Sequence, residues 1–296
     1  MSSPEPAAAR LPAATRPGAV SLAVVDLAAE EAFYRQVLGL AVTRQQDGLL
    51  ELGAGGEPLV RLVAGARPPR DDAAPGLYHL AIRLPDRAAL GAWLRHALAL
   101  GAPLQGAADH GVSEAVYLSD AEGNGVEIYR DRPREAWLVD DARIHMVTEA
   151  LDARGVVASA AGPWRGAPPE TVMGHVHLQV GELTRSRAFY AGALGLPVTN
   201  AAFPGACFLG AGGYHHHLGL NTWGVAPRAR RSLGAPGLEA FELLLPARAD
   251  IEAAAMRLRG SAAETHEDEQ GVDVTDPDGI RLHLRVAPEV QRPAIR

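Results

Sequence analysis

Short runs in which hydrophobic and polar residues alternate follow one another along the chain, and each group of runs contains one segment with helical periodicity. Residues 19–27 alternate as a strand does, and apolar residues then recur at helical spacing within residues 30–40. Gly39 stands where a glycine commonly ends a helix. Further strands are predicted at 49–52 and 59–63. The first part of the chain therefore predicts a βαβββ unit.

The signature of this unit returns later in the chain at a constant distance. The corresponding residues, each pair 156 apart, are Asp26 and Glu182, Phe33 and Phe189, and Gly39 and Gly195. The motif Asp-x-x-Gly at 120–123 recurs at 276–279 with the same spacing. Within the first half, a second strand and helix repeat the pattern 60 residues on, from Asp26 to Asp86. Such internal repetition predicts four units, at residues 19–63, 77–131, 172–222 and 237–286.

These repeats divide the chain into two tandem halves of two modules each. The N-terminal half spans residues 19–131 and the C-terminal half residues 172–286. A segment rich in charge and proline, residues 132–171, connects them. The Ala- and Pro-rich residues 1–18 are predicted to be a disordered tail, and residues 287–296 a C-terminal tail.

Composition narrows the class of protein. Of the 296 residues 47% are hydrophobic and 21% charged, as in a globular protein with a buried core. The formal net charge of −7 provides no basic surface for nucleic acid or for an anionic membrane. The chain has no apolar run of the roughly 18 residues that a membrane span needs, and we expect no signal peptide. The single Cys207 excludes an internal disulfide and favours a reducing, cytoplasmic location.

The stretch 110–129 combines turn formers with ionisable side chains. Two alternating runs flank residues 120–125, which predicts a hairpin of antiparallel strands. Glu127 lies between Val126 and Ile128, so alternation places its carboxylate on the face opposite to both. If those two residues face packing helices, Glu127 faces a cavity and needs a metal ion or a cation as partner. Otherwise it is an ordinary exposed strand residue.

The repeated Val-x-Asp-Leu, Phe-Tyr and Leu-Gly-Leu signatures resemble the vicinal oxygen chelate superfamily, which includes glyoxalase I, bleomycin resistance proteins and extradiol dioxygenases. The resemblance covers residues 19–286. It implies an α+β fold whose modules pair into cupped mixed β-sheets with helices outside. It also implies a divalent metal on a concave face, with ligands from the first and last strand of each module. Modules two and three are expected to pair with each other, and modules one and four likewise.

The resemblance implies metal ligands in the two inner modules only. The first-strand position, seven residues before the acidic residue that opens the helix, holds His79 in module two and His175 in module three. In the outer modules it holds Ala19 and Ala240, which cannot bind a metal. The last-strand position of module two holds Glu127. Together these residues would form a two-His, one-carboxylate triad for Fe(II), with Mn(II) as the alternative metal.

Three other histidines bear on this assignment. His177 shares a strand face with His175 and would replace it if the register were shifted. His217 and His283 hold the last-strand positions of modules three and four. Because no first-strand histidine accompanies His283 in the outer modules, we interpret it as structural.

The resemblance also suggests residues that contact the substrate. Tyr117 precedes Glu127 by ten residues, as in the extradiol dioxygenases, and His110 lies about two residues closer to Glu127 than in that pattern. Module three ends with three histidines that include the counterpart of the family's acid/base residue: His215, His216 and His217. The motif favours His216, whereas strand alternation favours the other two. All three therefore stay candidates, with His216 preferred, and a His-rich surface strand is the remaining alternative.

The span 76–133, with Gly174-His175 and the three-histidine motif, resembles bacterial catechol 2,3-dioxygenases of the four-module type. This implies an Fe(II) enzyme that inserts O2 into a catechol-type aromatic diol and yields a ring-opened semialdehyde. One alternative is a glyoxalase-like isomerase or lyase, in which His217 would complete four protein ligands. The other is a non-catalytic, aromatic-ligand-sequestering protein of the bleomycin resistance type. The expected partners are the diol and O2, and the sequence leaves a homo-oligomer open.

Overall fold

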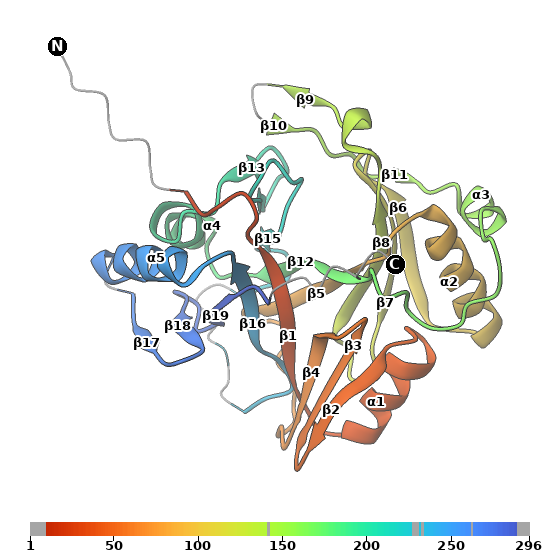
Figure 1. The fold of residues 1–296 in the computed structure, drawn as a ribbon, viewed down its shortest axis with the longest axis horizontal. Helices are drawn as coiled ribbons and strands as arrows, with labels where there is room; N and C mark the ends of the chain where they lie inside the picture. Colours follow the sequence, from red (N-terminus) through yellow and green to blue (C-terminus); the bar gives the residue numbers. More distant parts are fainter. Residues whose placement is uncertain (1–9, 141–142, 227–230, 232–233, 262, 289–296) are drawn as a thin grey trace, which may run out of the picture.

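The fold is known from a computed structural model that describes residues 10–140, 143–226, 231, 234–261 and 263–288 (Figure 1). Two mixed β-sheets, of nine and eight strands, run through its centre, and the helices lie outside them. The predicted α+β class and the two tandem halves are confirmed.

Four βαβββ modules follow one another along the chain. Module one consists of β1 (Arg16–Val24), α1 (Leu27–Gln36), β2 (Ala41–Gln46), β3 (Leu49–Ala54) and β4 (Glu57–Ala64). Module two consists of β5 (Gly76–Arg83), α2 (Arg87–Leu100), β6 (Leu104–Asp109), β7 (Ser113–Ser119) and β8 (Gly125–Asp131). Module three consists of β12 (Val172–Gln179), α4 (Leu183–Arg187) with a π-helical continuation (Ala188–Ala193), β13 (Val198–Asn200), β14 (Ala206–Leu209) and β15 (Leu218–Asn221). Module four consists of β16 (Gly237–Leu245), α5 (Arg248–Gly260), β17 (Thr265–Glu267), β18 (Gly271–Thr275) and β19 (Arg281–Val286).

The connecting segment has short elements of its own. They are a 3₁₀ turn (Arg134–Ala136), β9 (Val139–Asp140), β10 (Arg143–Ile144), β11 (Glu149–Ala150) and α3 (Ala153–Ala158). Strand β11 pairs with β6 and so extends the sheet of module two. One strand of the connecting segment is therefore part of the inner sheet, whereas β9 and β10 form a separate two-stranded sheet.

The modules pair as the sequence predicted. Modules two and three share the nine-stranded sheet, in the order β11-β6-β7-β8-β5-β12-β15-β14-β13. Modules one and four share the eight-stranded sheet, in the order β17-β18-β19-β16-β1-β4-β3-β2. In each sheet the first strands of the two modules meet as antiparallel neighbours, β5 with β12 and β1 with β16. Side chains of β5 and β12 that share a face are thus brought together.

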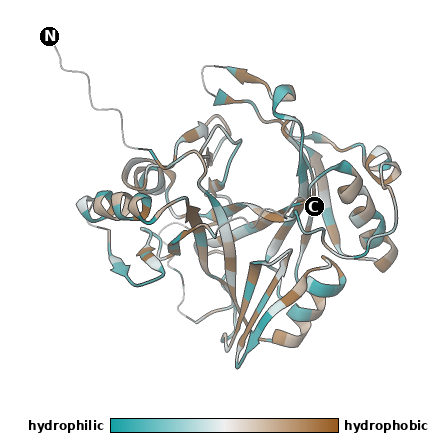
Figure 2. Cartoon of the chain, in the orientation of Figure 1, coloured by the Kyte–Doolittle hydropathy of each residue, from teal (hydrophilic) through white to brown (hydrophobic). Residues whose placement is uncertain are grey.

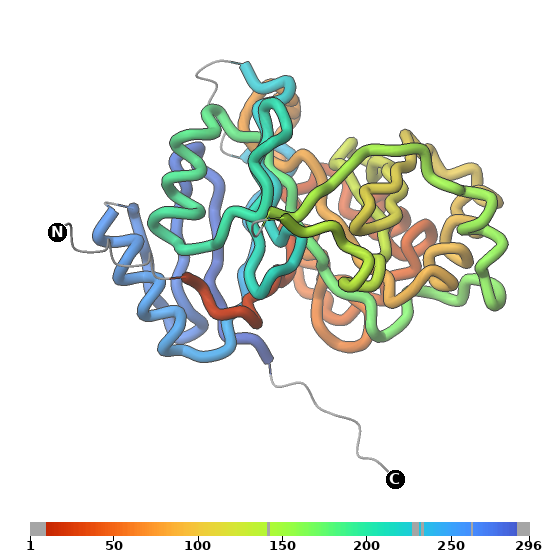
Figure 3. Tube along the Cα trace, turned by 90° about the horizontal axis from the view of Figure 1, so that it is seen from above, coloured from red at the N-terminus to blue at the C-terminus, as the bar shows by residue number. Residues whose placement is uncertain are grey.

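The hydrophobic core lies between the sheets and their helices. The central strands are mostly hydrophobic, whereas α1 and α5 carry hydrophilic positions as well (Figure 2). Seen from above, most of the first half of the chain lies on one side of the molecule and most of the second half on the other (Figure 3). No helix in the described part of the chain combines the length and apolar character needed to cross a bilayer.

The ordered chain begins earlier than predicted. Leu11 is 5% exposed and packs in the main core, and β1 starts before residue 18, so residues 10–18 are not a disordered tail. One apolar anchor within an Ala- and Pro-rich stretch gives no periodic signal, which explains the difference. Residues 1–9 lie outside the described residues, as does the predicted C-terminal tail from residue 289 onward.

The repeated Phe-Tyr and Asp-x-x-Gly signatures contact each other across modules. Tyr34 Oη donates to Asp120 Oδ2 at 3.1 Å, and Tyr190 Oη donates to Asp276 Oδ2 at 2.8 Å. All four side chains are buried. Each tyrosine belongs to the helical segment of one module and each aspartate to the turn before the last strand of the next. In the N-terminal half this bond fixes the turn that leads into β8.

The two halves of the chain differ in the residue that lies near the Tyr–Asp hydrogen bond. Position 30 holds glutamate, whereas the corresponding position 186 holds serine. Glu30 is fully buried, and its Oε2 has no hydrogen-bond partner among the described residues. Asp120, in contrast, accepts four hydrogen bonds. Burial and the charge of Asp120 raise the pKa of Glu30 to about 8, so near neutral pH the proton resides on Glu30 and the charge on Asp120.

A Glu30→Gln variant should be more stable than the parent protein above pH 8. Between its ordinary pKa of 4.5 and about 8, Glu30 is protonated in the folded chain only, so the free energy of unfolding falls as the pH rises through this window. The amide cannot ionise, and its advantage should reach on the order of 3 kcal/mol at pH 9. Urea unfolding at pH 6 and pH 9 measures it, with the surface variant Glu31→Gln as control. Equal pH dependence in parent and Glu30→Gln would contradict the assignment.

Candidate metal centre

The β7–β8 hairpin carries Glu127 into the concave side of the inner sheet. The two strands pair antiparallel around the turn that Asp120 anchors, as predicted. Val126 and Ile128 are buried in the main hydrophobic core, so alternation sends the Glu127 carboxylate to the other face. Glu127 is 2% exposed. It therefore occupies the cavity side rather than an exposed strand surface.

His79 on β5 and His175 on β12 reach the same place from adjacent strands. Ala81 of β5 lies opposite Glu127 of β8 on one side and opposite His175 of β12 on the other. Because Ala81 carries only a methyl group, the larger side chains on both sides can converge above it. His79 stands two residues earlier on the same face of β5. The junction of the two modules thus assembles the three residues.

The three side chains form a nearly equilateral triangle of ligand atoms. His79 Nε2 lies 3.3 Å from His175 Nε2, and each of these nitrogens lies 3.1 Å from Glu127 Oε2. Ligands that occupy neighbouring corners of an octahedron at bond lengths of about 2.1–2.2 Å are roughly 3.0–3.1 Å apart. The triangle therefore fits a divalent metal ion bound on one face. Among the residues that the structure describes, this is the one such group of His, Cys, Asp or Glu side chains.

Electrostatics gives Glu127 and His175 the protonation states that metal binding requires. Burial would raise the pKa of Glu127, but His175 and His79 hold it well below its ordinary value, so Glu127 is a carboxylate. Burial lowers the pKa of His175 to about 4, so its imidazole is neutral at pH 7. An ionised carboxylate and a neutral imidazole are the ligand forms of these side chains.

A fourth protein ligand has no place beside this triangle. In module three, His177 of β12 pairs with Gly219 of β15 as Ala81 pairs with Glu127 in module two. Gly219 is therefore the counterpart of Glu127, and a Cβ added there would lie 2.8 Å from His177 Cδ2. The His177 ring fills that space, and its Nε2 accepts a hydrogen bond from Asn221 at 3.1 Å. Within the described residues, no other His, Cys, Asp or Glu joins the three ligand atoms.

The three side chains line a cavity of about 520 Å³. Apolar and aromatic side chains form much of its wall, among them Val112, Met146, Phe203, Phe208 and Trp223. The polar side chains that line it include His79, Glu127 and His175 together with His110, Tyr117, His177 and His216. Most of the residues predicted from the sequence thus meet in one cavity. Met146 and Thr148 come from the connecting segment, in which no site residue was predicted from the sequence.

His110 and Tyr117 form a hydrogen-bonded pair on one wall. The Nδ1–H of His110 donates to the Val147 carbonyl at 2.7 Å, because a carbonyl can only accept. In a neutral ring the Nε2 is then the acceptor, and Tyr117 Oη donates to it at 2.7 Å. Burial and the nearby Glu127 raise the pKa of Tyr117 well above its ordinary value, so the phenol keeps its proton. The phenol oxygen can still accept a hydrogen bond from a bound hydroxyl.

The three consecutive histidines point in different directions. His216 lines the cavity, and its ring centroid lies 4.1 Å from that of His175. His215 lies behind it, where its Nε2 contacts Asp131 Oδ1 at 3.0 Å. His217 stacks on Tyr214 with ring centroids 4.6 Å apart, and its Nδ1 accepts from a backbone amide.

Strand alternation therefore gave the wrong prediction for His215 and His217. Strand β15 begins only at Leu218, so the three histidines lie in the preceding turn, where period-2 alternation does not apply. Because His217 faces away from the triad, it cannot be the fourth ligand that the glyoxalase-like alternative required. His283, on β19 of the outer sheet, bonds Asp273 Oδ1 through Nδ1 at 2.7 Å and lies apart from the metal-ligand group, in keeping with a structural role.

Residues 16–128 and 172–284 both match the family model described as the Glyoxalase/Bleomycin resistance protein/Dioxygenase superfamily. The chain belongs to this superfamily. The chain is 36% identical over 271 residues to the catechol-2,3-dioxygenase of Bacillus subtilis (strain 168). The match covers 89% of this chain and 94% of that protein. The sequence-based assignment to the superfamily, and to an enzyme similar to catechol 2,3-dioxygenases, is confirmed.

Solved structures of the superfamily share the fold. A putative dioxygenase from Bacillus subtilis subsp. subtilis str. 168 matches with a TM-score of 0.67 at 14% identity, covering 95% of this chain and 87% of that one. Glyoxalase I from Zea mays matches with a TM-score of 0.58 at 18% identity, covering 92% of both chains. At these identities the likeness shows the fold alone.

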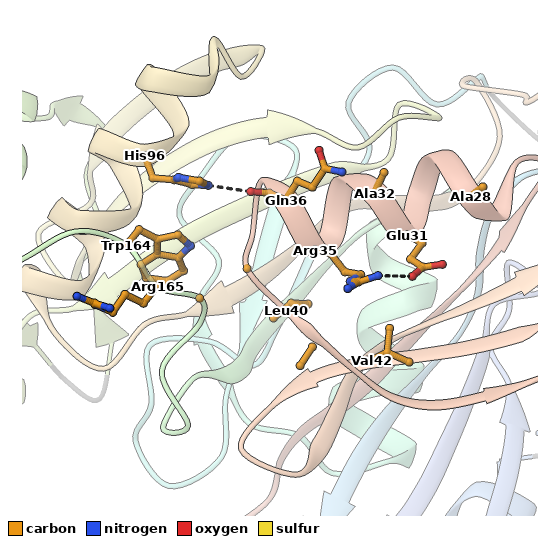
Figure 4. A pocket seen from close by; sticks show the side chains of 13 residues that line it. Ala28, Glu31, Ala32, Arg35, Gln36, Leu40, Val42, His96, Trp164 and Arg165 are labelled. Carbon is orange, nitrogen blue, oxygen red and sulfur yellow. Dashed lines mark hydrogen bonds and ion pairs between the residues drawn. The ribbon is translucent and has the colours of Figure 1, made fainter.

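This superfamily member has a second, larger hollow that contains none of the predicted site residues. It measures about 860 Å³ and lies between α1, α2 and the loop around Trp164 (Figure 4). Two contacts join residues of its wall: Arg35 pairs with Glu31, and His96 Nε2 donates to the Gln36 carbonyl. Size alone does not make this hollow a site, whereas the smaller cavity holds the convergent ligand atoms.

Proposed function

We propose that the protein is an Fe(II)-dependent extradiol dioxygenase that opens the ring of a catechol-type diol beside its two hydroxyl groups. Both atoms of O2 enter the product, a ring-opened semialdehyde with an acid group, so the reaction balances without an external reductant. The metal triad, the adjacent base and the aromatic wall of the cavity support this proposal. The 36% identical catechol-2,3-dioxygenase supports the class of substrate.

One observation supports the proposal most, namely that the ligand atoms of His79, Glu127 and His175 converge while Gly219 stands where a fourth ligand would be expected. A two-His, one-carboxylate set leaves open positions on Fe(II) for substrate and O2. Four protein ligands would favour a glyoxalase-like isomerase, but Gly219 stands at the fourth place and His177 fills the space. A purely sequestering protein has no need of the triad at all.

When bound, Fe(II) would supply adjacent sites for both diol oxygens and for O2, and would pass electron density from ring to oxygen. The residues of the chain then have distinct tasks. His216 lines the cavity and could take the proton of a diol hydroxyl and return it later in the reaction. Tyr117 and His110, on another part of the wall, orient the diol by hydrogen bonding.

The walls select for a flat apolar ring. Phe203, Phe208 and Trp223 line the cavity on the side of module three, and Met146 closes it from the connecting segment. Aromatic side chains pack favourably against an aromatic ring and exclude water from it. The cavity of about 520 Å³ leaves room for substituents on a single ring.

Anaerobic loading with Fe(II), followed by catechol and O2, tests the proposal. The expected result is a yellow ring-opened product, one O2 consumed per catechol, and two ¹⁸O atoms in the product when ¹⁸O2 is used. Isomerisation of a thiohemiacetal by the Zn(II)- or Ni(II)-loaded protein, without consumption of O2, would instead establish the glyoxalase-like alternative. Binding of catechol without turnover would establish the sequestering one.

A Tyr117→Phe variant should keep its iron but turn over more slowly. The substitution removes one hydrogen bond to the bound diol and leaves His110 Nε2 without its donor. A hydrogen bond to a charged group contributes about 1.5–3 kcal/mol, which corresponds to a decrease in kcat of roughly 10- to 100-fold. Steady-state oxygen uptake and iron content measure the effect. Unchanged kcat, or loss of iron, would contradict the assigned role.

A further inference from the structure

A chain of three side chains runs from the edge of the cavity into the protein. His216 Nδ1 lies 2.8 Å from His215 Nδ1, and His215 Nε2 lies 3.0 Å from Asp131 Oδ1. His216 belongs to the cavity wall, whereas His215 is fully buried. Asp131 ends β8, the strand that carries Glu127, so the chain crosses from module three to module two.

Asp131 is held as an ionised acceptor. Arg83 Nη1 donates to its Oδ2 at 3.0 Å, and Tyr214 Oη donates to the same carboxylate at 3.0 Å. Tyr214 in turn accepts from Tyr129 Oη at 2.7 Å. Although burial would raise the pKa of Asp131, the hydrogen bond that His215 donates and the charge of Arg83 hold this pKa below its ordinary value.

These contacts determine which ring nitrogens carry protons. A carboxylate only accepts, so His215 Nε2 carries the proton that it donates to Asp131. In the neutral His215 ring, Nδ1 is then an acceptor, and its partner at 2.8 Å must be the Nδ1–H of His216. In the neutral His216 ring, Nε2 is left with a free lone pair. The structure shows no hydrogen bond between this nitrogen and any described residue, so it is the one available to a bound molecule.

We infer that Asp131 and His215 are positioning residues that fix the tautomer and orientation of His216 so that its bare Nε2 faces the cavity. This inference rests on the proposed function for its catalytic consequence, while the tautomer itself is a property of the protein alone. The arrangement extends the catalytic machinery beyond the residues that touch metal or substrate. It also gives a role to the first of the three consecutive histidines.

The variant Asp131→Asn should reverse the direction of the hydrogen bonds that join residue 131, His215 and His216. Arg83 can only donate, so it holds the amide oxygen and turns the amide NH2 toward His215. His215 must then accept at Nε2 and donate from Nδ1, which makes His216 Nδ1 an acceptor and places the proton of His216 on Nε2. That nitrogen can no longer take a proton from the diol. In serine proteases, the same Asp-to-Asn change imposes the wrong histidine tautomer and lowers kcat about 10⁴-fold.

Histidine ¹⁵N NMR tests the tautomer without relying on turnover. In protein with ¹⁵N-labelled histidine, metal-free and loaded with diamagnetic Zn(II), His216 should show a protonated Nδ1 and a bare Nε2. In Asp131→Asn the two should exchange. A protonated His216 Nε2 in the parent protein would overturn the inference, whether or not the variant folds.

Kinetics tests the consequence. Asp131→Asn should lower kcat roughly 100-fold or more while iron content and KM for catechol stay within twofold of the parent. The matched control is His217→Asn. This buried neighbour takes no part in the hydrogen bonds between Asp131, His215 and His216, and the amide oxygen can replace Nδ1 of His217 as acceptor. A parallel loss of iron, KM and kcat in Asp131→Asn would show a merely structural role and contradict the inference. If the parent protein itself does not cleave catechol, the proposed function fails, and the NMR result still decides the tautomer.

Discussion

Replacing His79 by alanine should leave the protein folded but without its iron, and ring cleavage should fall at least about 10³-fold. The variant keeps two of the three proposed ligands, His175 and Glu127, whose atoms lie 3.1 Å apart. Loss of a residue that merely supports a ligand already weakens metal binding about 10- to 100-fold, so loss of a ligand must weaken it more. Activity should follow the iron content because, in the proposed function, the open positions on the metal would hold both reactants. Iron analysis after anaerobic loading and gel filtration measures the first effect, and oxygen uptake the second.

The outer sheet offers a matched control for this experiment. His283 stands at the last-strand position of module four. The first-strand positions of the two outer modules hold Ala19 and Ala240, which cannot bind a metal. The imidazole of His283 pairs with Asp273 instead of converging with other ligands. His283→Ala should therefore retain iron and activity. If His79→Ala retained iron and activity, His79, Glu127 and His175 would not be the metal site.

Replacing His216 by alanine should have the second largest effect, with the opposite pattern for the metal. Its ring packs against His175 but belongs to none of the three ligand positions, so iron content should stay close to one per chain. Loss of a general acid or base lowers kcat by roughly 10²- to 10⁴-fold. The KM for the diol should change much less, because the aromatic wall and the metal positions remain. Full activity in His216→Ala would assign the base to another residue.

The triad could be predicted from the sequence because every step depended on repetition and strand parity. His79 and His175 stand at equivalent places in two modules, and β5 and β12 are continuous strands whose faces follow period 2. The same is true of Glu127 in β8. Pairing of the inner modules then brings these faces together, which the family resemblance implied and the sheet order confirmed.

The surroundings of the triad could not be predicted in the same way. The turn before β15 has no period, so only coordinates distinguish His216, in the cavity, from His217, stacked on Tyr214. Asp131 ends a strand like many exposed acidic residues, and only the contact between modules two and three brings His215 to it. Met146 lies in a segment that the sequence showed merely as a connection. Such contacts join residues that are distant in the chain, and no local pattern encodes them.

Anomalous diffraction at the iron absorption edge, from crystals loaded with Fe(II) without oxygen, would show whether His79, Glu127 and His175 bind the metal. We expect one peak per chain, about 2.0–2.3 Å from His79 Nε2, His175 Nε2 and a Glu127 carboxylate oxygen, with its open side toward the aromatic cavity. A peak bound only by the histidines at 215–217, or no peak at the triad in fully loaded crystals, would contradict this assignment.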